Sequence, residues 1–476
     1  SCREAASFNP PRAAWMHDLT ASFAPCATCC CGHGRSFARR REVSVLAASR
    51  EALRKTDLRR RIGWVREMQG LAIDALGPDA AVGELCRILV RTHTDPSAAA
   101  GRVDEPAGVL AEVVGLKPGR VTLMPYGPAE GIAAGCEVHA LGADSQIGVG
   151  PALLGRVIDC FGEPLDGMPK PLTTQRRPLR GVPINPMKRP PIERVLETGI
   201  RSIDALLTLG QGQRVGIFAG SGVGKSTLLG LLARHVKTQA GADGQGSINV
   251  IALIGERGRE VREFIEKQLG VDGLARSVVV VATSDQPALA RLRAAYAALA
   301  IAEHFRDGGS NVLLTMDSVT RFAMARREVG LSAGEPPTAR GYTPSVFAEL
   351  PELCERCGTA PGGGSITALL TVLVEGDDLN EPVSDALRAI LDGHIVLSRQ
   401  LAHRGHYPAI DVLKSVSRLM PELADDDERA LAVAAVKQLA MLERNRQMID
   451  IGAYEKGSNA ELDRALTIEA GLQDWL

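Results

Sequence analysis

The most informative segment of the chain is Arg214-Val-Gly-Ile-Phe-Ala-Gly-Ser-Gly-Val-Gly-Lys-Ser-Thr227, followed directly by Leu228-Leu-Gly-Leu-Leu-Ala233. Its apolar start predicts a β-strand, its glycine-rich middle a tight loop, and its end the first turns of a helix. This order of strand, loop and helix is the context in which G-x-x-x-x-G-K-[ST] binds phosphate. Ala219, a small residue, stands where the motif has its first glycine.

The chemistry of a phosphate site explains the residue types in this loop. Glycine has no Cβ, so glycines at every second position let backbone N–H groups turn toward phosphate oxygens. The Lys225 ammonium can reach the β and γ phosphates, and the Ser226 hydroxyl can bind Mg²⁺ at the positive end of the helix. A lysine and a serine at these offsets disfavour the alternative of a glycine-rich turn without a ligand. The predicted phosphate-binding residues are Gly220, Ser221, Gly222, Val223, Gly224, Lys225, Ser226 and Thr227.

A second apolar strand, at 311–317, ends in Asp317. The carboxyl ends of parallel strands meet at one edge of a sheet, so Asp317 is expected beside the phosphate loop, holding the water shell of Mg²⁺. Ser318 and Thr320 follow, and they keep open the alternative that Asp317 caps the next helix.

A third apolar strand, at 249–254, ends in Gly255-Glu-Arg257. Here Glu256 can polarise the attacking water and Arg257 can neutralise phosphate charge. The alternative is a surface salt bridge within the highly charged stretch 256–263.

Composition excludes several classes of protein. The 476-residue chain has 55 Lys and Arg against 56 Asp and Glu, a formal charge of −1, which argues against a polyanion binder driven by bulk charge. Aromatic residues make up only 4%, too few for a platform that stacks single-stranded nucleic acid. No apolar run approaches ~18 residues, and no secretory signal is visible. Ten cysteines in so long a chain fit a reducing cytoplasm better than a disulfide scaffold.

The chain divides into regions of different character. Residues 1–44 mix proline pairs, a basic run and a cysteine cluster, and we expect a disordered leader. Within it, Cys26, Cys29 and His33 have metal-ligand chemistry but lack a second, separated ligand pair. A short amphipathic helix is expected at 45–60.

A small β-barrel is predicted for the region up to residue 145, because short β-type runs alternate with turn signals. The predicted strands are 62–65, 71–75, 85–90, 109–114, 121–125 and 137–141. A long loop is expected at 92–107, and a proline-rich linker with little regular structure at 164–191.

An α/β core with a parallel sheet, similar in pattern to a P-loop NTPase, is predicted for 146–420, because continuous apolar strands alternate with helices. The predicted strands are 214–218, 249–254, 277–282, 312–316 and 366–374, and the predicted helices are 225–236, 259–269, 287–306 and 383–391. Residues 421–476 are expected to form a helical domain with helices at 425–449 and 460–472, broken by Gly452 and Gly457.

From about residue 46 onward the chain resembles the ATPase of the bacterial flagellar and type III secretion export apparatus, a family similar to the catalytic subunit of rotary ATP synthases. Eight motifs match in the same order, which is far more specific than any one of them. They are residues 150–159, 219–227, 255–261, 316–323, 334–342, 392–399, 405–411 and 415–418. The leader, the loop 92–107 and the glycine-rich segment 239–246 depart from the family pattern without touching a matched motif.

The resemblance implies roles for single residues. Glu256 matches the catalytic glutamate that orients water, and Arg257 the arginine beside it that contacts phosphate. Tyr407 matches an aromatic residue that packs on adenine, with ordinary core packing as its alternative. Arg418 matches an arginine finger that enters the neighbouring subunit's site, with a helix-end arginine bound to carbonyls as its alternative. Arg321 and Arg340 also lie in matched motifs and are expected to support the site or an interface.

The resemblance implies a RecA-like ATPase that binds ATP and Mg²⁺ and works as a homohexameric ring. Such a ring energises export by releasing chaperones and unfolding substrates. Expected partners are a stator-like regulatory protein at the N-terminal region, chaperone–substrate complexes and, peripherally, the membrane export gate. The expected location is the cytoplasm, at the inner-membrane export apparatus, and no specific nucleic acid is expected.

Three alternatives stay open on the sequence alone. Residues 451–459, followed by Leu462 and Asp463, resemble the flagellar branch more than the virulence-type (injectisome) branch. A catalytic subunit of a rotary ATP synthase shares the site residues, although the amino-acid sequences of 219–226 and 341–351 resemble the export branch more closely. A hexameric RNA translocase is disfavoured by the near-zero charge and the few aromatic residues.

Overall fold

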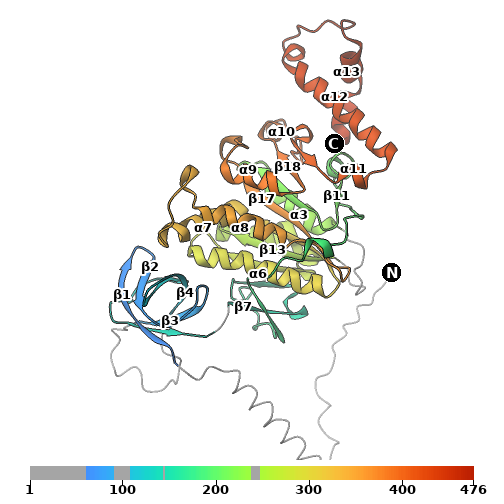
Figure 1. The fold of residues 1–476 in the computed structure, drawn as a ribbon. Helices are drawn as coiled ribbons and strands as arrows, with labels where there is room; N and C mark the ends of the chain where they lie inside the picture. Colours follow the sequence, from blue (N-terminus) through green and yellow to red (C-terminus); the bar gives the residue numbers. More distant parts are fainter. Residues whose placement is uncertain (1–59, 91–107, 143–144, 237–246) are drawn as a thin grey trace, which may run out of the picture. The chain divides into compact units, whose positions relative to one another are not determined.

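The computed structural model describes residues 60–90, 108–142, 145–236 and 247–476 (Figure 1). The expected leader with its cysteine cluster, the helix at 45–60, the loop at 92–107 and the segment at 239–246 therefore lie outside the described residues. None of the helices within the described ranges combines the length and the apolarity needed to cross a lipid bilayer.

The first described domain is a closed six-stranded barrel in the order β1-β2-β5-β4-β3-β6, as predicted. Its strands are β1 (Ile62–Gln69), β2 (Ala72–Leu76), β3 (Leu85–Leu89), β4 (Gly108–Lys117), β5 (Arg120–Pro125) and β6 (Glu137–Ala140). Alternate side chains point inward, as the period of a strand requires, and Ile73, Ile88 and Leu123 are fully buried there.

The central domain is built on a nine-stranded sheet in which β12 lies between β17 and β18. The strands are β8 (Arg156–Ile158), β12 (Arg214–Ala219), β13 (Ile248–Ile254), β14 (Ser277–Ala282), β15 (Asn311–Asp317), β16 (Gly358–Thr359), β17 (Ser365–Leu373), β18 (Gly393–Leu397) and β19 (Val416–Ser417). All pairings are parallel except those of β16 and β19. The five predicted strands are present within one residue. The other four have two to five residues and are too short to show a periodic pattern.

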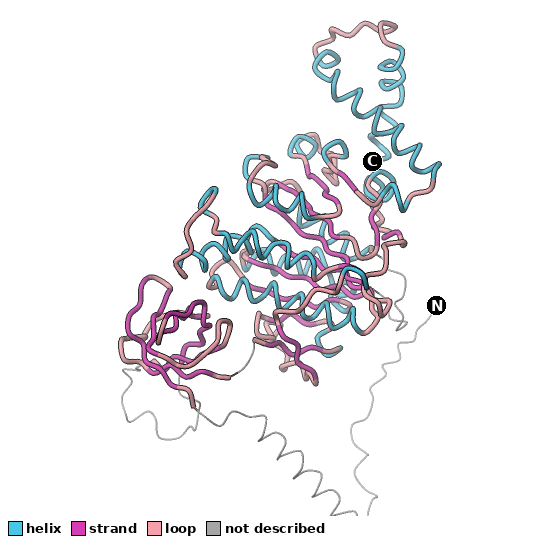
Figure 2. Tube along the Cα trace, in the orientation of Figure 1, coloured by secondary structure: helices cyan, strands magenta, loops and turns pink. Residues whose placement is uncertain are grey.

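Helices cover both faces of this sheet (Figure 2), which explains its continuous apolar strands. They are α2 (Arg201–Leu206), α3 (Lys225–His235), α4 (Gly258–Glu263), α5 (Gly270–Ala275), α6 (Ala288–Asp307), α7 (Val319–Ser332), α8 (Pro344–Glu355), α9 (Pro382–Ile390), α10 (Arg399–His403) and α11 (Met420–Leu423). In β13, Val250 and Ala252 pack into the core under α6 to α9, whereas Ile251 and Leu253 pack into the core under α3.

Two helical predictions need correction. The single helix expected at 259–269 is α4 followed by a π-helix, Phe264–Leu269. The π-helix ends at Gly270, the first residue of α5, whose φ of 67° lies outside the right-handed helical region. The helices α7 and α8 were not predicted, although Pro344 stands at the first turn of α8, where proline is favoured.

The segment expected as a linker with little structure contains a strand, β9 (Gln175–Pro178), paired antiparallel with β7 (Gln146–Val149). Arg177 of this segment forms an ion pair with Glu303 of α6. Arg356, which follows α8, donates a hydrogen bond to the carbonyl of Leu179. Arg356 and Glu303 form a bidentate ion pair whose side chains are 3% and 2% exposed.

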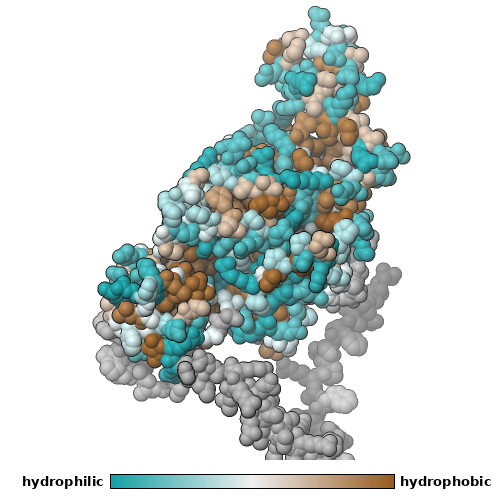
Figure 3. Space-filling view, viewed as in Figure 1, coloured by the Kyte–Doolittle hydropathy of each residue, from teal (hydrophilic) through white to brown (hydrophobic). Residues whose placement is uncertain are grey.

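The chain ends in two helices, α12 (Asp426–Asp450) and α13 (Ala460–Trp475), that pack on each other through Leu442, Leu462 and Ala465. Asp425 and Glu428 form a capping box at the start of α12. The visible face of the molecule is mostly hydrophilic, with hydrophobic groups at the barrel and near these helices (Figure 3).

Candidate nucleotide site

The loop between β12 and α3 has the conformation that its glycines permit. Gly222 and Gly224 have φ values of 79° and 93°, in the left-handed region where residues with a Cβ are disfavoured. Gly224 is the N-cap of α3, so no cap side chain occupies the first-turn N–H groups. Ser226 and Thr227 are exposed beside them. The loop can therefore receive phosphate oxygens at the positive end of a helix.

Lys225 joins two carboxylates that come from different strands. Its Nζ lies 2.5 Å from Oδ1 of Asp317, at the end of β15, and 3.5 Å from Oε1 of Glu256, after β13. Thr371, on the intervening strand β17, donates a hydrogen bond of 2.7 Å to the same Oδ1 of Asp317. Sequence reasoning missed Thr371; it is one of two threonines, with Thr367, in a predicted strand that is apolar apart from them.

The charges of this cluster shift its pKa values. Burial raises the pKa of Glu256 from 4.5 to about 7; Asp317 also raises it, whereas Lys225 opposes the rise. Burial lowers the pKa of Lys225, but the charges of Asp317 and Glu256 outweigh it and leave the pKa raised. Lys225 is thus a cation, and Glu256 can exchange a proton near neutral pH.

Asp317 and Arg257 each have a structural alternative with which their contacts can be compared. The N-cap of α7 is Ser318, whose side chain accepts the N–H of Arg321, so Asp317 does not cap that helix. Arg257 forms a surface salt bridge, which was the alternative to a role in phosphate binding. Its side chain is 80% exposed, and its Nη1 lies 3.8 Å from Oε1 of Glu260. Within the described residues, no ion pair joins Arg257 to Glu256 or Asp317.

Tyr407 lies beside the phosphate loop. A methyl carbon placed on Gly224 would be 3.6 Å from its ring, and the side chain is 61% exposed, which disagrees with the core-packing alternative. The aliphatic part of Arg321 packs on Gly255, where an added Cβ would meet the Cβ of Arg321 at 2.9 Å. Arg321 therefore lines the strand end that carries Glu256.

Arg418 and Arg340 lie apart from this cluster. Arg418 is exposed, just after β19, and donates to the carbonyl of Arg388 at 3.1 Å. Within this subunit the structure does not bring it to the phosphate loop. Arg340 pairs with Asp378 at 3.1 Å.

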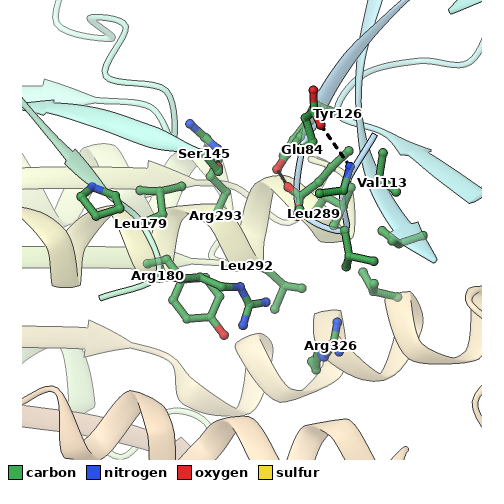
Figure 4. A pocket seen from close by; sticks show the side chains of 18 of the residues that line it. Glu84, Val113, Tyr126, Ser145, Leu179, Arg180, Leu289, Leu292, Arg293 and Arg326 are labelled. Atoms are coloured by element: carbon green, nitrogen blue, oxygen red, sulfur yellow. Dashed lines mark hydrogen bonds between the residues drawn. The ribbon is translucent and has the colours of Figure 1, made fainter. Parts of the chain in front are cut away.

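A larger cleft, of about 700 Å³, lies away from the phosphate loop, between residues of the barrel and of α6 to α8 (Figure 4). Its charged side chains have partners within the protein: Glu349 accepts from Tyr296 and Arg180, Arg293 donates to main-chain carbonyls, and Tyr126 donates to Glu112. Phosphate binding needs free donors, and the N–H groups at the start of α3 are not occupied by a cap side chain.

Comparisons with known proteins agree with this geometry. The nucleotide-binding domain of the ATP synthase alpha/beta family matches residues 199–417, the beta-barrel domain of that family matches 65–142, and the T3SS EscN ATPase C-terminal domain matches 424–476.

Curated relatives are similar over nearly their whole length. The flagellum-specific ATP synthase of Bacillus subtilis is 53% identical over 90% of this chain and 93% of its own. That of Salmonella typhimurium is 49% identical over 88% and 89%. The type 3 secretion system ATPase of Xanthomonas euvesicatoria is 47% identical over 88% and 90%.

Among solved structures, the assembled ATPase EscN of the enteropathogenic E. coli type III secretion system has a TM-score of 0.79 and 43% identity. The match covers 87% of this chain and 94% of that one. EscN in complex with its central stalk EscO has a TM-score of 0.75.

The fold and the phosphate loop define a P-loop ATPase with a RecA-like core, a barrel before it and helices after it. More narrowly, the chain belongs to the ATP synthase alpha/beta family, in its branch of flagellar and type III export ATPases. The family resemblance inferred from the sequence, its fold class and its ATPase activity are confirmed; the roles of the single site residues and the domain boundaries stay predictions.

Proposed function

We propose that this chain hydrolyses Mg²⁺-ATP to drive protein export through a flagellar type III apparatus. The observation that carries the proposal is the contact of Lys225 with both Asp317 and Glu256 directly after a glycine loop. A cation for the phosphates, a carboxylate for the metal and a carboxylate for water are the parts that phosphoryl transfer to water requires.

The residues present fit a magnesium ion. Ser226 is exposed at the first turn of α3, and Asp317 is held by Thr371, so hard oxygen ligands are available at the loop. When bound, Mg²⁺ would neutralise charge on the β and γ phosphates. Asp317 would hold it partly through water, and Lys225, released from the carboxylates, would bind phosphate oxygens.

Glu256 would orient the attacking water. Its pKa of about 7 lets the carboxylate form at neutral pH and accept a proton. Tyr407, exposed beside Gly224, would pack on the adenine ring. Arg257 would contact phosphate only after its exposed side chain turns toward the loop.

We propose a homohexamer in which Arg418 completes the neighbouring subunit's site. Its exposure directly after the edge strand β19 supports this, because an arginine finger must face outward. The assembled state of EscN and its complex with a central stalk are supporting analogies. A stator-like protein, chaperones with their substrates and, peripherally, the membrane export gate are the proposed partners, and the cytoplasm is the proposed location.

We favour flagellar over virulence-type export. The most similar flagellar relative given above is 53% identical and the type 3 secretion relative 47%, which favours the flagellar assignment.

The test uses the purified full chain. Phosphate release from ATP and binding of a fluorescent ATP analogue are measured with Mg²⁺ and with a chelator. We expect Lys225→Ala to abolish both, and the matched control Lys437→Ala, on α12 in an exposed ion pair, to change neither. A wild-type chain that neither binds the analogue nor releases phosphate would contradict the proposal.

A further inference from the structure

A charged pair lies directly against the phosphate loop, on elements that the proposed reaction does not use. A methyl carbon on Gly220 would lie 2.7 Å from Nη2 of Arg399 and 2.7 Å from Oδ1 of Asp377. The two side chains also face each other, with Nε of Arg399 3.5 Å from Oδ2 of Asp377. The absence of a side chain at Gly220 therefore lets this pair contact the loop backbone.

Asp377 is held in an unusual backbone conformation. Its φ is 59°, and in the described part of the chain only one other non-glycine residue, Arg340 with φ 51°, has a positive φ. The two loops that contain these residues are joined by the ion pair of Arg340 with Asp378, at 3.1 Å. Left-handed non-glycine residues persist where their surroundings enforce them, and they gather at functional sites.

Arg399 lies on a segment that adjoins the phosphate loop at two places. It begins α10, directly after β18, and β18 is paired with the P-loop strand through Leu397 and Ala219. Eight residues after Arg399, the same segment delivers Tyr407 to Gly224. The segment thus touches the loop at both of its ends.

There is room for this pair to separate. Gly220, Asp377 and Arg399 line a cleft of about 420 Å³, and the side chains of Arg399 and Asp377 are 43% and 50% exposed. A partly exposed pair is weak enough to break when its loop moves, yet specific enough to favour one arrangement.

We propose that Arg399 is a positioning residue for the nucleotide: through Asp377 it couples the loop at 375–380 to the phosphate loop at Gly220. When the pair is formed, the loop backbone is held in its phosphate-binding arrangement, and when the loop at 375–380 moves, affinity for ATP falls. This inference rests on the proposed ATPase function and assigns a positioning role to two residues that the proposed reaction does not use.

The test is a double-mutant cycle on the full chain, with Arg399→Gln, Asp377→Asn and the double variant. Asparagine keeps the size of Asp377 and tolerates the left-handed conformation, so only the charge is removed. Dissociation constants for a fluorescent ATP analogue, KM and kcat are measured with Mg²⁺. The control is Lys437→Gln, which breaks an exposed ion pair on α12.

We expect each single variant to weaken binding and raise KM by roughly two- to fivefold, the range for a partly exposed pair, with kcat nearly unchanged. The double variant should be no worse than the weaker-binding single variant. Thermal unfolding should not shift, which separates positioning from loss of fold. Unchanged affinity in both variants, or strictly additive losses, would overturn the inference while leaving the ATPase function standing. Failure of the wild type itself to bind the analogue would overturn both.

Discussion

The carboxyl of Glu256 lies 3.5 Å from the ammonium of Lys225, and burial raises its pKa to about 7. The contact places it beside the phosphate loop, and the raised pKa sets the pH at which it becomes a base. Both can be tested by single substitutions.

Glu256→Gln keeps the size of the side chain but removes the group that accepts a proton. We expect turnover to fall by about 10²-fold or more, with little loss of ATP affinity, because an amide cannot act as a general base. Phosphate release and analogue binding measure the two effects. Glu461→Gln, the same change in an exposed ion pair on α13, is the control. Parallel loss of binding and turnover in Glu256→Gln would contradict the assigned role.

The pH profile provides a second test of Glu256. The carboxylate is the active form, so kcat/KM, which reports the free enzyme, should rise with pH through about 7 and level off above it. Glu260 also raises this pKa, so Glu260→Gln should move the midpoint to lower pH. A profile that is flat between pH 6 and 8 would exclude Glu256 as the titrating base.

The raised pKa of Glu256 affects the stability of the fold in the opposite direction to its effect on activity. A carboxyl whose pKa is raised in the folded state binds its proton more tightly there than in the unfolded chain. Its contribution is therefore fully present below about 4.5, the ordinary value, and is lost as pH rises through about 7. Activity and stability thus respond in opposite directions to ionisation of Glu256.

Among the elements of the central domain, the segment that contains β9 is attached through the buried ion pair of Glu303 and Arg356. Oε1 of Glu303 lies 2.8 Å from Nε of Arg356, and Oε2 lies 3.0 Å from Nη2. The pair joins the C-terminal part of α6 to the residue that follows α8, and Arg356 also holds the carbonyl of Leu179. One contact thus links three segments distant in sequence.

Glu303→Ala should destabilise the central domain by about 3–5 kcal/mol, because it leaves the Arg356 charge buried without its partner. Urea unfolding followed by fluorescence and circular dichroism would show a lower midpoint. Glu461→Ala, which breaks the exposed pair with Lys437, should leave the midpoint unchanged. Equal effects of the two variants would mean that burial of the pair does not matter.

At the scale of the whole molecule, the site is incomplete in one subunit if Arg418 acts across an interface. Arg418→Ala should abolish the rise in specific ATPase activity with protein concentration, and reduce the assembled rate by about 10³-fold or more. Activity is measured over a dilution series with the oligomeric state followed by light scattering. A variant that assembles and still gains activity would show that Arg418 is not the finger.

The barrel, the P-loop, the core strands and the C-terminal helices could be predicted from the sequence, because each is encoded by a local pattern of period two or 3.6 or by glycine spacing. It also indicated Asp317 and Glu256, since both directly follow apolar strands. Short strands such as β18 and the π-helix after α4 carry no such pattern.

Which side chains meet could not be predicted in this way, because it depends on how the segments pack. Lys225 and Asp317 are 92 residues apart, and the sheet order that inserts β17 between their strands makes Thr371 their neighbour. The same packing turned Arg257 outward and brought Arg399 and Asp377 against Gly220. Local propensity fixes each backbone segment, whereas contacts between segments depend on the register and order in which the sheet assembles them.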